Sequence, residues 1–225
     1  MYIAIFEKRR IYEGIRRPHA IVIGKLYMTN DPTSPGADIA AYAYRPSLLG
    51  APWEFRITAG GLEWEAGRKT GSVALRDIRR IRLSFRPANM QTRRYVTEIW
   101  ADNAPKLQIV SCSWKSMVVQ ERLDGPYAAF VRELHARIAQ AGVHARLERG
   151  SHPLVYWPGL VVFAAVTLGL LALIVRALQA QALGGAAFIG VFCILFLWQS
   201  GNFFRRNVPG VYRPDALPAT LLPKG

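Results

Sequence analysis

Two uncharged apolar runs stand back to back in the last third of the chain. The first covers residues 154–175, and a helix of that length is about 33 Å long, enough to cross a hydrocarbon core of about 30 Å. The second covers residues 183–198. An irregular chain cannot turn inside lipid with its amides unpaired, so the runs predict a transmembrane helical hairpin. We expect it over residues 153–204, with spans at about 154–176 and 182–203.

The second run is the shorter of the two. Its 16 residues make about 24 Å of helix, so it reaches full thickness only if the helix continues to residue 203. Gln199, Ser200 and Asn202 would then lie near the lipid headgroups. A re-entrant hairpin is the alternative.

Basic residues flank the hairpin unevenly. Such residues stay on the cytoplasmic side of a membrane, and the link between the runs carries only Arg176. We therefore expect a multi-pass protein of the bacterial inner (cell) membrane with both termini in the cytoplasm. The flanking arginines are Arg146, Arg149, Arg205, Arg206 and Arg213.

The chain carries a formal net charge of +14, most of it before the hairpin. This excess suits a domain held beside an anionic leaflet. Nucleic acid is the rival partner for such a balance. The sequence contains no helix-turn-helix, zinc finger or arginine-rich recognition helix, so we expect no nucleic-acid binding.

Residues 1–50 are predicted to form a basic, poorly ordered N-terminal arm. Met28 opens a segment that reads like an ordinary polar start. Residues 1–27 are therefore either an extension upstream of a misassigned start codon or part of the arm.

From Trp53 onward apolar residues alternate with polar ones, and turns rich in Gly, Pro and Asn separate the runs. Such short alternating runs are typical of an antiparallel β-barrel or sandwich. Residues 77–81 break the alternation, which predicts a bulge or an irregular turn. A helix between Asp124 and Gly142 is expected to close the barrel, with His135 just beside its apolar stripe and partly exposed. The stripe consists of Tyr127, Phe130, Val131, Leu134 and Ile138.

The order of strand, glycine turn, strand, a third strand reading VALRDIRRIRL at residues 73–83, further strands and a closing helix resembles a bacterial pleckstrin-homology-like (PH-like) domain. We assign this domain to residues 51–148. The hairpin and the tail resemble those of small bacterial membrane proteins that carry such domains. The resemblance implies an α+β membrane protein that serves as a binding or assembly module without known chemistry. The turn at residues 59–61 lacks the basic cluster of inositol-phosphate-binding relatives, so that activity is not expected.

A band of arginines is the strongest local feature of the predicted domain. Alternation would put Arg80, Arg82 and Arg86 on one sheet face, where they could contact anionic phospholipid headgroups or an acidic protein partner. The alternative is a solvated face that nearby glutamates neutralise. The candidate contact residues are Arg79, Arg80, Arg82, Arg86, Arg93 and Arg94.

No pattern indicates an enzyme. The four histidines lack metal-ligand spacing, and two cysteines cannot build a cysteine-rich zinc site. We expect no catalytic residues, no metal and no cofactor. Uncharged spans also disfavour a transporter, because transport paths usually require buried ionisable groups.

Residues 205–225 form a proline-rich tail, expected in the cytoplasm. It would run extended and either dock a partner or pack on its own domain or the membrane face. Together the sequence predicts a membrane-anchored, non-enzymatic binding or assembly module. The alternative is an accessory subunit that packs against a larger membrane complex. The sequence predicts no oligomeric state.

Overall fold

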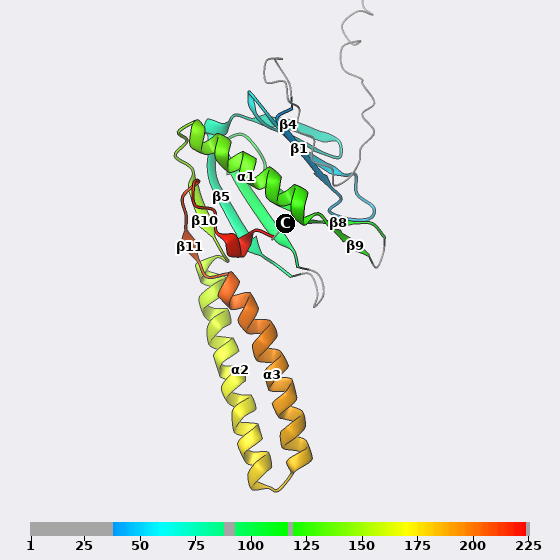
Figure 1. Cartoon of the computed structure of the whole chain (residues 1–225), viewed down its shortest axis with the longest axis vertical. Helices are drawn as coiled ribbons and strands as arrows, with labels where there is room; N and C mark the ends of the chain where they lie inside the picture. The colour runs from blue at the N-terminus through cyan, green and yellow to red at the C-terminus, as the bar shows by residue number, and fades with distance from the viewer. Residues whose placement is uncertain (1–37, 88–92, 117–118, 224–225) are drawn as a thin grey trace, which may run out of the picture.

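A computed structural model describes residues 38–87, 93–116 and 119–223. These residues form a β-rich domain from which two long helices project side by side (Figure 1). Residues 1–37 of the predicted N-terminal arm, Met28 among them, lie outside the described residues.

The first sheet is an antiparallel meander with strand order β1-β2-β3-β4. Its alternating residues bury Tyr42, Phe55 and Leu62 on one face. The arm predicted to extend to residue 50 is wrong here, because β1 precedes that boundary and belongs to the domain. The strands are β1 (Ala40–Tyr44), β2 (Trp53–Thr58), β3 (Gly61–Ala66) and β4 (Lys69–Val73).

The second sheet has the order β11-β10-β5-β6-β7. Its register shifts between Ile78 and Arg80, which confirms the predicted bulge. A short 3-10 turn (Leu75–Asp77) leads into it, and β10 pairs with β5 in parallel. The strands are β5 (Ile78–Phe85), β6 (Tyr95–Ala101), β7 (Leu107–Val110), β10 (Arg146–Arg149) and β11 (Gly210–Val211).

Tyrosine hydroxyls join the two sheets. Tyr42 Oη donates to the carbonyl of Val110 at 2.6 Å, and Tyr44 Oη donates to the carbonyl of Gln108. Both carbonyls belong to β7, the edge strand, so these bonds cap polar groups that strand pairing leaves open. The described strands form separate open sheets rather than the closed barrel that was one of the two predicted forms.

Helix α1 (Asp124–Gln140) covers the core beside β1 (Figure 1). Its buried side chains follow the predicted stripe, and they include Tyr127, whose hydroxyl lies 2.7 Å from that of Thr97 on β6. The last alternating run before the helix, which begins at Leu107, is interrupted after Val110. A separate two-stranded sheet, β8 (Cys112–Trp114) with β9 (Gln120–Arg122), leads into the helix.

The helices α2 (Pro153–Gln179) and α3 (Leu183–Arg206) are both long and apolar enough to cross a membrane. Helix α3 has 24 residues, about 36 Å, so the second run continues to the length that a full span needs. The helices contact each other through one face each, where the tilted rings of Phe163 and Phe196 pack with centroids 5.3 Å apart. Their other faces carry exposed leucine, valine and phenylalanine.

The ends of the hairpin are bonded to β5. The side chain of Asn207 accepts from the N–H of Phe85 at 2.9 Å and donates to the carbonyl of Phe85 at 2.7 Å. It thus bonds the backbone groups of Phe85 as a paired strand would. The N–H of Gly150 donates to Leu83 O, and the N–H of Ser151 donates to Asn207 O. We call this set of contacts the junction, and it fixes the hairpin's direction relative to the sheet.

The residues after α3 return to the domain. Strand β11 pairs with β10, and Leu221 and Leu222 are buried in the core cluster. A short 3-10 turn (Ala219–Leu221) contacts β5. Of the two arrangements open for the tail, packing on its own domain is therefore the one observed for residues 207–223.

Candidate functional site

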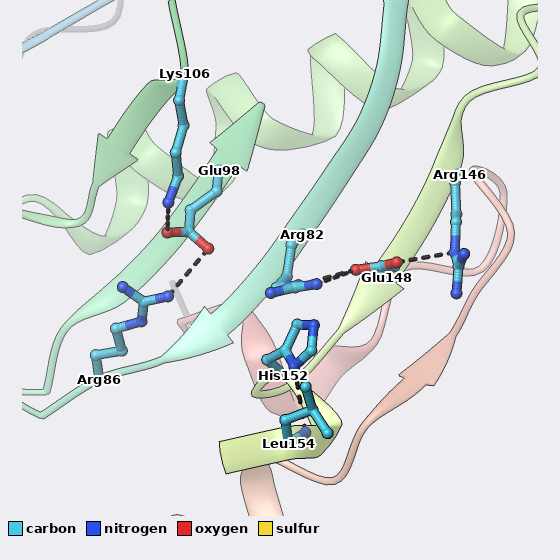
Figure 2. Close-up of polar contacts among 8 residues, drawn as sticks. All are labelled: Arg82, Arg86, Glu98, Lys106, Arg146, Glu148, His152 and Leu154. Carbon is cyan, nitrogen blue, oxygen red and sulfur yellow. Dashed lines mark hydrogen bonds and ion pairs between the residues drawn. The ribbon is translucent and has the colours of Figure 1, made fainter. Parts of the chain in front are cut away.

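The predicted arginine band lies on and beside β5. Because β5 alternates, Ile81, Leu83 and Phe85 enter the core, whereas Arg80 and Arg82 lie on the face opposite α1. Figure 2 shows this outer face with α1 behind the sheet. It carries a row of ion pairs that we call the charge ladder, made of Arg82, Arg86, Glu98, Lys106, Arg146 and Glu148.

Glu148 anchors one side of the charge ladder. Its Oε2 accepts from Arg82 Nε at 2.9 Å and from Arg82 Nη2 at 2.5 Å, and its Oε1 pairs with Arg146 Nε at 2.8 Å (Figure 2). The side chains of Arg82 and Glu148 are 11% and 12% exposed. Arg82 is thus a nearly buried structural partner of β10 rather than an open contact residue.

Glu98 anchors the other side. Its side chain is 1% exposed, and its oxygens bind Arg86 Nη2 at 3.0 Å and Lys106 Nζ at 2.6 Å (Figure 2). Both cations remain more than 40% exposed. Each buried carboxylate of the charge ladder is therefore held between two basic side chains, and the excess positive charge faces outward.

Three basic side chains of this face lie over the ring of Trp100. The Arg80 guanidinium lies 4.0 Å from the ring centroid, Lys106 Nζ 5.0 Å and the Arg82 guanidinium 5.5 Å. A cation over an indole face is stabilised by the ring quadrupole. Arg80 is accordingly held flat against the sheet, half-buried.

The remaining candidates separate from the charge ladder. Arg79 pairs with Asp102 through Nε at 2.7 Å, and this bond lowers the pKa of the Asp102 carboxyl. Arg93 is exposed just before β6. Arg94 is half-buried and lines a cavity at the end of β1. The six predicted residues thus do not form one contact surface.

Sequence reasoning did not assign Glu148 and Lys106 to this site. Glu148 belongs to a four-residue strand after α1 that was not predicted from the sequence. Its pairing with β5 is parallel and spans 66 residues, so no local pattern points to it. Among the described residues, no three His, Cys, Asp or Glu side chains come together in a way that could hold a metal.

Comparison with known proteins identifies no relative. No protein-family model matches the chain, and no curated protein or solved structure does. Function is therefore inferred below from the geometry alone.

His135 joins the tail to α1. The expectation of a partly exposed histidine is wrong, because His135 is 0% exposed. Its Nδ1 lies 2.7 Å from Val131 O and its Nε2 lies 2.7 Å from Tyr212 Oη, which suits a neutral ring that donates to the carbonyl and accepts from the phenol. Burial lowers the pKa of His135 to about 4, with the Val131 bond opposing it.

The lowered pKa of His135 makes stability depend on pH. Between pH 6.5 and pH 4 the unfolded chain binds a proton that the folded chain excludes, so stability is full above pH 6.5 and falls toward pH 4. We expect the free energy of unfolding to be about 2 kcal/mol lower at pH 5 than at pH 8. Urea titration of the full chain in detergent, followed by tryptophan fluorescence, measures this. The variant His135→Gln should lack that part of the slope; an unchanged slope contradicts the assignment.

Proposed function

We propose that this chain is a membrane-anchored, non-enzymatic binding or assembly module, with its β-rich domain at the cytoplasmic face of a bacterial inner membrane. The observation that carries the proposal is the junction. Asn207 and Gly150 bond both ends of the hairpin to β5, so insertion of the helices would hold the domain in one orientation on the leaflet.

Exposure of the hairpin supports insertion. A core helix of a water-soluble protein is mostly buried, whereas Leu154, Phe188 and Trp198 are 79%, 76% and 75% exposed. Such a continuous apolar surface is stable in lipid and costly in water. The arginines beyond both helix ends, set against Arg176 alone near the tip, support cytoplasmic termini and two passes.

The order of elements supports a PH-like domain. A four-stranded antiparallel meander is followed by three antiparallel strands, β5 to β7, then by the two-stranded sheet β8-β9, and then by the helix that closes the core. Strands β10 and β11 would be additions that widen the second sheet and join it to the hairpin.

The arginines near the junction would contact the lipid headgroups. Arg206 donates to Tyr95 Oη at 2.9 Å, so the start of β6 lies beside the end of α3. Arg93 and Arg205 are both exposed at this end of the domain, and the side chain of Arg86 is 43% exposed. Each basic residue near an anionic surface contributes about 1 kcal/mol.

The test of anchoring is extraction. After alkaline carbonate washing of membranes, the full chain should stay in the pellet. Its release into the supernatant would contradict the proposal.

The test of headgroup contact uses the double variant Arg93→Ser/Arg205→Ser. The full chain is purified from membranes in mild detergent, and retained phosphatidylglycerol is measured against phosphatidylcholine by mass spectrometry. We expect the variant to retain roughly tenfold less anionic lipid, because two interfacial cations are lost. Arg132→Ser, an exposed substitution on α1, is the matched control and should change nothing. Equal retention by both variants would exclude these arginines as the contact.

An accessory subunit of a larger membrane complex is the second candidate. The observation that favours it is open space at Gly169, Gly184, Gly190 and Gly201, where an added Cβ would meet nothing within 4 Å. Small residues let another helix approach closely. Purification in mild detergent distinguishes the two candidates: a stable hetero-complex favours the accessory subunit, and a single species the self-contained module.

A further inference from the structure

A cavity of about 140 Å³ lies where the two sheets meet, at the end of β1. Residues of both sheets and of the β8-β9 hairpin line it. It is separate from the charge ladder. The residues that matter below are Tyr44, Arg45, Trp53, Arg94, Trp114 and Gln120.

Two polar atoms in this lining are shut off from solvent and have no hydrogen-bond partner among the residues that the structure describes. They are Arg94 Nε, a donor, and Gln120 Oε1, an acceptor. A buried polar group without a partner costs free energy, so such atoms are usually satisfied by something that enters the site. An occupant that satisfies both must accept a hydrogen bond from Arg94 and donate one to Gln120.

The charge of the lining selects an anion. Arg45 and Arg94 contribute two positive charges, and the lining contains no aspartate or glutamate. Burial raises the pKa of the Cys112 thiol, the positive charge of Arg94 opposes this, and the negative charge of Asp124 adds to it. The rings of Tyr44, Trp53 and Trp114 supply apolar and π surface for the rest of the occupant.

We propose that this cavity binds the C-terminal residue of a partner polypeptide. Its carboxylate accepts from Arg94, and its own backbone N–H donates to Gln120. A phosphodiester offers acceptors only and would leave Gln120 Oε1 unsatisfied. The volume admits one terminal residue, or about five waters. The choice of a protein partner rests on the proposed binding or assembly role.

The probe is N-acetylglycine, which carries both the carboxylate and the adjacent N–H. It is titrated against the full chain in detergent while the indole N–H signals of Trp53 and Trp114 are followed by NMR. We expect saturable shifts of these two signals. N-acetylglycinamide, which lacks the charge, should bind about tenfold more weakly or worse.

Variants assign the two bonds. Arg94→Gln should weaken N-acetylglycine binding about tenfold, whereas Arg68→Gln, an exposed arginine in the β3-β4 turn, should have no effect. Gln120→Leu should weaken N-acetylglycine severalfold but leave propionate, which has no N–H, unchanged. The comparison of carboxylate with amide on the unaltered chain holds even if a variant fails to fold.

Four outcomes overturn the proposal. The first is the absence of shifts in both indole signals, which leaves water alone in the cavity. The second is equal binding of N-acetylglycinamide, and the third is equal binding of N-acetylglycine by Arg94→Gln. The fourth is preferential binding of glycerol phosphate, which would indicate a free-phosphate site, or of short-chain phosphatidylglycerol, which would indicate a lipid-headgroup site. Because the titration is done in detergent, its failure leaves the membrane-anchoring test untouched.

Discussion

Replacing Arg82 by methionine should lower the free energy of unfolding by about 3–5 kcal/mol. Glu148 would then remain almost buried between the sheet and the start of α2, with only Arg146 as a partner. The side chain of Arg146 is 72% exposed and binds the other oxygen, so it cannot replace the two nearly buried hydrogen bonds from Arg82 to Glu148 Oε2. Urea titration of the full chain in detergent, followed by tryptophan fluorescence, measures the change.

The double variant Arg82→Met/Glu148→Leu should recover most of that loss. Apolar residues of similar volume often replace a buried ion pair at little cost. Arg146 would be left without a carboxylate, but it is exposed enough to be hydrated. If the double variant is as unstable as Arg82→Met alone, the Arg82 contribution comes from packing against Trp100 and not from Glu148.

Gly150→Ala should disrupt the junction. Gly150 has a φ of +79°, which costs an alanine about 1–2 kcal/mol. An added Cβ would also lie 2.4 Å from the carbonyl oxygens of Asn207 and Val208. A shift of the Asn207 backbone would break its hydrogen bonds to Ser151 and, through its side chain, to Phe85 of β5. We expect a total loss above about 3 kcal/mol and faster hydrogen exchange at the N–H groups of Phe85 and Ser151.

Gly142→Ala is the matched control. Gly142 also has a positive φ, +61°, but an added Cβ there meets nothing within 4 Å. Its substitution should cost only the backbone term of about 1–2 kcal/mol and leave exchange at Phe85 unchanged. Similar losses for the two variants would mean that the junction is not tightly packed.

The elements with strong local patterns were predicted well. The alternation after Trp53, the bulge near Ile78 and the stripe of α1 each depend on residues close in sequence. Strand β1 was missed because a short run rich in alanine, followed by Pro and Gly, carries no clear period. The paired sheets could be expected, but whether they close into a barrel could not, since that depends on edge contacts such as those of Tyr42 and Tyr44.

The arginine band could be located but not interpreted from sequence. Alternation indicated that Arg80 and Arg82 share a face, and they do. Their burial depends on Glu148, which β10 brings from 66 residues away, and on Trp100 of the neighbouring strand. The environment of His135 likewise depends on Tyr212, 77 residues later and beyond both α2 and α3. Long-range partners of this kind leave no trace in local periodicity.

The route of the chain has a consequence for biosynthesis. Asn207 bonds to β5, Tyr212 bonds to His135 of α1, and Leu221 is buried in the core. All three are translated only after both apolar helices. When residues 38–149 have emerged from the ribosome, the domain therefore still lacks these three side chains. If the hairpin is inserted as proposed, the domain completes its folding only after that step, and a nascent protein that fails insertion would present an unfinished core to the cell's proteases.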